Sequence, residues 1–91
     1  MIILKIDKIR QSIDKLDEQI LNNIANRKKL VRQIAKIKKS MKMPVFDRDR
    51  EKYIINKLKN KAKKKGLQEK FVVKLFKIIL ENSKIDQKPN K

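Results

Sequence analysis

The stretch that decides the fold is residues 9–38, IRQSIDKLDEQILNNIANRKKLVRQIAKIK. Its large aliphatic side chains recur every three or four residues, which is the spacing of one face of an α-helix. With one more turn, that face comprises Ile9, Ile13, Leu16, Ile20, Ile24, Val31, Ile34 and Met41. The whole pattern spans roughly 38 residues, on the order of 57 Å at 1.5 Å per residue. Two short helices of the same chain cannot cover it, so we expect pairing with another long helix, most simply its own copy in a symmetric dimer.

Proline and glycine divide the rest of the chain. Pro44 ends the first helical pattern, Gly66 ends a second, and Pro89 lies in a polar tail. No segment alternates with period two over a useful length, so no strands are expected. We therefore predict an all-α single domain, residues 1–91, with a frayed tail at 87–91 and helices at about 4–41, 48–64 and 68–86.

The net charge and the composition suggest some kinds of partner and exclude several kinds of catalytic site. The chain has 27 Lys plus Arg against 10 Asp plus Glu, a net charge of +17, which invites a nucleic-acid or anionic-membrane partner. It has no Cys and no His, which excludes disulfides, a His-ligated zinc, a Ser-His-Asp triad and a Cys-His pair. The first apolar run is too short for a signal peptide, and none approaches the ~20 residues that cross a bilayer, so we expect a cytoplasmic protein.

Polar side chains occupy core-facing positions in each expected helix. They are two cations, two carboxylates and two neutral hydrogen-bonding groups: Arg27 and Lys38, Asp47 and Glu51, Ser83 and Gln87. Each has a simpler explanation alone, such as an N-cap for Asp47 or an edge position for Arg27. Burying all of them is costly unless they bond to one another or to a ligand. Together they predict a pocket for a small anion in the core of a helix bundle.

Arg10 suggests that this pocket is shared between subunits. It lies beside the apolar face, 17 residues before Arg27, or about 25 Å along the same helix. One small ligand cannot touch both side chains from a single chain. Antiparallel pairing of two long helices would bring Arg10 of each subunit to the pocket of the other, giving two equivalent sites per dimer.

The ordered set of these residues resembles the all-helical chorismate mutase family in its monofunctional form. The resemblance covers roughly residues 5–88 and is carried by residues 9–38, by PVFDRDREKYII at 44–55 and by LFKIILENSKIDQ at 75–87. It implies an intertwined six-helix homodimer that converts chorismate to prephenate, for phenylalanine and tyrosine biosynthesis, without a cofactor or a metal. That intramolecular Claisen rearrangement needs conformational restraint rather than a nucleophile or a proton transfer, which fits a chain without His or Cys.

The resemblance assigns binding of the chorismate dianion to five positions. Arg10, donated across the dimer interface, Arg27 and Arg50 match arginines of the site, where guanidinium groups hold carboxylates directionally. Ser83 matches a serine near a carboxylate, and Asp47 matches an acidic residue near the ring hydroxyl.

Three further positions are implied to be catalytic. Lys38 matches a lysine that contacts the ether oxygen and a carboxylate, and Gln87 matches a glutamine that donates to the ether oxygen. Negative charge develops on that oxygen in the transition state, so fixed donors stabilise it. Glu51 would accept a hydrogen bond from the ring hydroxyl. Because Gln87 is a neutral donor at any working pH, we expect little loss of activity at neutral or mildly alkaline pH.

Other functions remain as alternatives. An isochorismate pyruvate lyase on the same scaffold would use a similar carboxylate-binding pocket, although the pair Lys38 and Gln87 favours the mutase. A basic helical nucleic-acid-binding protein is supported by the net charge and by the run KLKNKAKKK at 57–65. It is opposed by the few aromatic side chains and by the absence of a recognised binding motif, so we expect no nucleic-acid or membrane partner. A purely structural dimer would leave the polar core positions unexplained.

Overall fold

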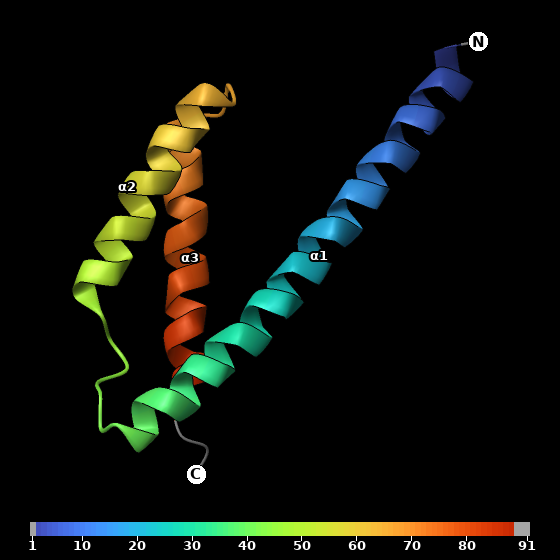
Figure 1. The fold of residues 1–91 in the computed structure, drawn as a ribbon. Helices are drawn as coiled ribbons and strands as arrows, with labels where there is room; N and C mark the ends of the chain where they lie inside the picture. The colour runs from blue at the N-terminus through green and yellow to red at the C-terminus, as the bar shows by residue number, and fades with distance from the viewer. Residues whose placement is uncertain (1, 89–91) are drawn as a thin grey trace. The chain divides into compact units, whose positions relative to one another are not determined.

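The computed structural model describes residues 2–88, which form three α-helices (Figure 1). They are α1 (Ile2–Ser40), α2 (Arg48–Lys64) and α3 (Glu69–Gln87). No strand occurs among residues 2–88, so the all-α, three-helix expectation is confirmed. α3 extends to Gln87, one residue beyond the helix end expected from the sequence, and residues 89–91 of the expected tail lie outside the described residues. The chain divides into two compact units, residues 1–30 and residues 31–91.

The described part of the first unit is a single helical segment, residues 2–30 of α1. Its apolar face is largely exposed in the single chain, with Ile13 49 % and Ile20 56 % accessible. None of the residues of α1 is buried. Within this unit, the face identified in the sequence is therefore a largely exposed strip of aliphatic side chains. Across residues 2–88, no helix is both long enough and apolar enough to span a membrane.

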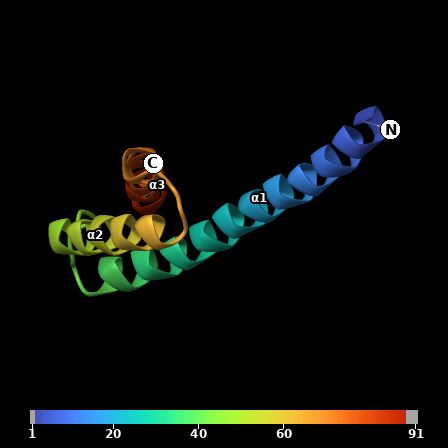
Figure 2. The same ribbon diagram turned by 90° about the horizontal axis from the view of Figure 1, so that it is seen from above.

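The second unit contains a hairpin of α2 and α3, which lie side by side in both views (Figures 1 and 2). Gly66 ends α2 with a positive φ of 72°, a conformation in which a side chain is strained. The N–H of Gly66 donates to the carbonyl of Lys63 at 3.2 Å, and that of Leu67 to the carbonyl of Ala62 at 2.9 Å. This pair of bonds is the Schellman motif, and it reverses the chain into α3.

A small core joins the two helices of the hairpin. Its buried apolar side chains are Ala62 of α2 and Val72 and Leu80 of α3. Ala62 is 2 % exposed, and its short side chain lets the helices approach closely near the turn. Ser83 continues the buried side of α3 with a polar group, toward the end of the helix where the polar network lies.

The end of α1 is a second Schellman motif, formed without a glycine. Lys42 has a positive φ of 56°. Its N–H donates to the carbonyl of Lys39 at 3.2 Å, and that of Met43 donates to the carbonyl of Lys38 at 2.8 Å. The turn redirects the chain into a short linker that leads to Asp47, the N-cap of α2. The linker backbone thereby comes close to the last turns of α1.

Candidate active site

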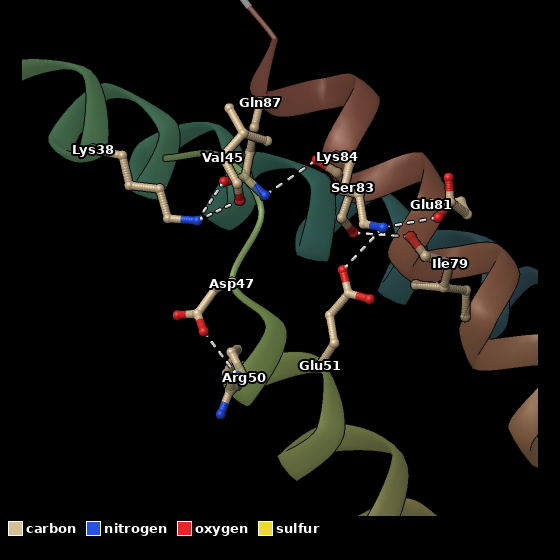
Figure 3. A network of polar contacts seen from close by, with 10 residues as sticks. All are labelled: Lys38, Val45, Asp47, Arg50, Glu51, Ile79, Glu81, Ser83, Lys84 and Gln87. Atoms are coloured by element: carbon tan, nitrogen blue, oxygen red, sulfur yellow. Dashed lines mark hydrogen bonds and ion pairs between the residues drawn. The ribbon is translucent and has the colours of Figure 1, made fainter. Parts of the chain in front are cut away.

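Lys38 connects three segments of the second unit. Its Nζ donates to the side-chain oxygen Oε1 of Gln87 at 2.8 Å and to the backbone carbonyl of Val45 at 2.9 Å (Figure 3). The end of α1, the linker and the end of α3 are therefore tied together by one ammonium group. Two of its three N–H donors are used in these bonds, so a third can be donated to a ligand.

Both polar atoms of the Gln87 side-chain amide are hydrogen-bonded, which fixes its orientation. Oε1 accepts from Lys38, and Nε2 donates to the carbonyl of Ser83, one turn earlier in α3, at 3.3 Å. The Ser83 hydroxyl donates to the carbonyl of Ile79 at 2.9 Å, and its side chain is buried. An amide NH2 carries two hydrogens, so Gln87 can hold this geometry and still donate to a bound molecule.

The first turn of α2 contributes three of the predicted site residues. Oδ1 of Asp47 accepts from the backbone N–H of Arg50 at 3.0 Å, so Asp47 caps the helix. The Arg50 guanidinium lies 5.3 Å from the ring centroid of Tyr53, a cation–π distance. Oε2 of Glu51 lies 3.4 Å from Nζ of Lys84, an ion pair between α2 and α3.

Lys84 is a residue that the sequence reasoning missed. Its Nζ lies 2.9 Å from Oε1 of Glu81 and 4.4 Å from the ring centroid of Phe46, in addition to the Glu51 contact. The hydrogen bond to Glu81 raises the pKa of Lys84 above its ordinary value, and the charge of Glu51 adds to this against the effect of burial. The i,i+3 spacing of Glu81 and Lys84 was the available signal, but it indicates only a local pair.

A surface hollow of about 720 Å³ adjoins the Lys38–Gln87 pair. Arg32 and Lys39 add positive charge to its lining, and Ile85 adds an apolar wall. This volume is within the usual range for a small-molecule site. The lining holds several cations, the neutral amide of Gln87 and one carboxylate, Asp86, so its excess of positive charge suits an anion that presents hydrogen-bond acceptors.

The second unit contains six of the eight predicted site residues, Lys38, Asp47, Arg50, Glu51, Ser83 and Gln87, and of these six Lys38 and Gln87 line the hollow. Of these, Lys38 and Gln87 are in direct side-chain contact. Arg10 and Arg27 belong to the unit of residues 1–30, which is described by itself. Within residues 2–88, no three His, Cys, Asp or Glu side chains gather as a metal site would require.

Comparison with known proteins extends these observations. The family model described as chorismate mutase type II matches residues 9–88. A chorismate mutase of Methanocaldococcus jannaschii is 37 % identical over 84 residues, which cover 92 % of this chain and 85 % of that protein. The bifunctional chorismate mutase/prephenate dehydratases of Buchnera aphidicola subsp. Schizaphis graminum and Escherichia coli K12 are 39 % and 33 % identical over 79 residues. Those residues cover 87 % of this chain but 20 % of each bifunctional protein.

Proposed function

The chain belongs to the chorismate mutase type II family, and from this premise we propose that it catalyses the rearrangement of chorismate to prephenate. The observation that carries the proposal is the contact of 2.8 Å between Lys38 and Gln87, which places a cation and a neutral amide together beside a cationic hollow. The pyruvate lyase and nucleic-acid alternatives are not favoured by the family or by the named relatives.

The reaction moves bonds within one molecule. The C–O bond of the enolpyruvyl ether breaks while a C–C bond forms between the side chain and the ring. Electron density builds up on the ether oxygen as its bond to the ring lengthens. Lys38 and Gln87 each have a remaining N–H to donate, and they are held before the substrate binds. Donors fixed in this way stabilise the developing charge without moving, which is the largest contribution expected from such a site.

The remaining residues of the site restrain the substrate. Arg50 supplies a guanidinium for a carboxylate, and Glu51 supplies an acceptor for the ring hydroxyl. Asp47 fixes the first turn of α2 from which both side chains project. Ser83 is proposed to lie near a substrate carboxylate, and its backbone carbonyl accepts from the Gln87 amide. Restraint of a flexible ether in its reactive conformation lowers the entropic part of the barrier.

We further propose that the active form is an intertwined homodimer with six helices, in which Arg10 of the partner subunit and Arg27 complete the carboxylate site. The exposed aliphatic strip of α1 supports this proposal. Covering half-exposed isoleucines such as Ile13 and Ile20 with a second helix removes apolar surface from water, which stabilises the dimer. The cytoplasmic location expected from the sequence stays a prediction, which cell fractionation would test.

Turnover of chorismate is the direct test. We expect the purified protein to consume chorismate and to release a product that acid converts to phenylpyruvate. Lys38→Ala should remove most activity while helicity is retained. Lys29→Ala is the matched control, since it removes the same charge from an exposed position nine residues earlier, on the opposite side of α1. A folded protein that leaves chorismate unchanged would refute the proposal.

A further inference from the structure

Lys84 lies where the first turn of α2 meets α3. Its ammonium contacts two carboxylates and an aromatic ring: Glu81 on its own helix, Glu51 on α2, and Phe46 in the linker. Its side chain is 26 % exposed, and that of Glu51 is 27 % exposed, so both charges are partly withdrawn from water. Figure 3 shows the Glu51 carboxylate and the Lys84 ammonium facing each other across the two helices.

The two carboxylates that contact Lys84 differ in exposure and in the helix to which they belong. Glu81 is 71 % exposed and is one turn away on the same helix, so its pairing with Lys84 is a local surface contact. Glu51 comes from a different element and is much less exposed. The contact with Lys84 fixes where the Glu51 carboxylate lies, because it ties the end of that side chain to α3.

The contact between Lys84 and Glu51 also affects the charge that the substrate meets. On the proposed function, Glu51 lies beside a substrate with two negative charges. A carboxylate in that place attracts the ring hydroxyl but repels the rest of the substrate. A cation directly behind the carboxylate reduces the repulsion and leaves the oxygen that accepts the hydrogen bond in place. Lys84 is a cation that contacts Oε2 of Glu51 directly, at 3.4 Å, and its contact with the Phe46 ring also ties the ammonium to the linker.

We propose that Lys84 is a positioning residue that acts through Glu51, holding this carboxylate at the hydroxyl end of the substrate and balancing its charge. The inference rests on the proposed chorismate mutase function. The hydrogen bond to Glu81 is the largest cause of the raised pKa of Lys84, and the charge of Glu51 contributes to it as well. Ser83 and Gln87 flank Lys84 on α3. On the proposed function, this turn therefore carries both Gln87, for the ether oxygen, and Lys84, which acts through Glu51 on the ring hydroxyl.

A double-mutant cycle tests the inference. Lys84→Met should lower kcat/KM by about tenfold, mainly through a higher KM, because an interaction formed in both ground and transition states is weakened. In a Glu51→Gln background, the same change should cost less than about twofold, because the group through which Lys84 acts is already neutral. Lys84→Arg should restore most of the activity, since it keeps the charge. Lys74→Met is the control for losing an exposed lysine of α3.

The outcomes separate this inference from the proposed function. An equal loss in both backgrounds would overturn it, because Lys84 would then act on the substrate directly. A lower melting temperature with unchanged kinetics would also overturn it and leave a structural role. If Lys84→Met fails to fold, the comparison of Lys84→Arg with Lys84→Gln in the two backgrounds gives the same cycle. A wild-type protein without turnover would refute the proposed function, and this inference with it.

Discussion

Replacing the amide of Gln87 by a carboxyl tests the electrostatic mechanism. Gln87→Glu keeps the shape of the side chain, but the new group can donate to the ether oxygen only when it is protonated. A glutamate has an ordinary pKa of about 4.3, and the Lys38 ammonium, 2.8 Å from the present amide oxygen, favours the ionised form still further. At pH 7.5, fewer than about one molecule in a thousand would carry the proton. Activity should therefore be present at acid pH and be lost as the pH rises.

The expected loss at pH 7.5 is about 10²- to 10³-fold in kcat, the usual effect of removing one donor from a developing oxyanion. The logarithm of kcat should rise by about one for each unit of decrease in pH down to about pH 5, while the wild-type profile stays nearly flat. Chorismate consumption, measured from pH 4.5 to 8.5, gives both profiles. Gln33→Glu, at an exposed position of α1, controls for the added charge. A variant profile that stays flat, or a loss below tenfold at pH 7.5, would show that Gln87 does not donate to the reacting oxygen.

Three further predictions concern stability and assembly. Lys42→Gly should raise the free energy of unfolding by about 1 kcal/mol, because φ of 56° strains a residue with a side chain; a lower urea midpoint would contradict this. Asp47→Ala should lower the free energy of unfolding by about 1 kcal/mol through loss of the helix cap, as measured by thermal melting. Mixing inactive Arg10→Ala and Lys38→Ala proteins should restore activity, since each mixed dimer has one intact site; no recovery despite proven subunit exchange would exclude a shared site.

The helices were predictable from the sequence because their signals are local. Gly66 ends α2 where a positive φ is required, and Asp47 caps the same helix at its start. The contact between Lys38 and Gln87 is different, since 49 residues separate the two side chains. The periodicity of the sequence predicts that each of them lies on an inward face of its helix. The family resemblance assigns both of them to the ether oxygen of the substrate. Their direct hydrogen bond emerged only from the structure.

Two features of the site had no usable signal in the sequence. The turn at Lys42 adopts a conformation that usually calls for glycine, so the path of the linker and the bond from Lys38 to the Val45 carbonyl could not be anticipated. Lys84 was one of many lysines and lay beside, not on, the stripe of polar interruptions. Its contact with Glu51 depends on how closely α2 and α3 approach, which the packing of Ala62, Val72 and Leu80 determines.

The bond from Lys38 to the Val45 carbonyl has a consequence for protein engineering. Because the Lys38 ammonium is anchored on the main chain of the α1–α2 linker, an added residue between Met43 and Val45 should shift this anchor and, on the proposed mechanism, lower activity while all three helices still form. The turn around Gly66 depends on the positive φ of that residue and on its two backbone hydrogen bonds, but none of the predicted site residues belongs to it. A fluorescent reporter or a second domain is therefore best joined between α2 and α3 with Gly66 kept in place, because this connection is at the opposite end of the hairpin from the start of α2 and the end of α3.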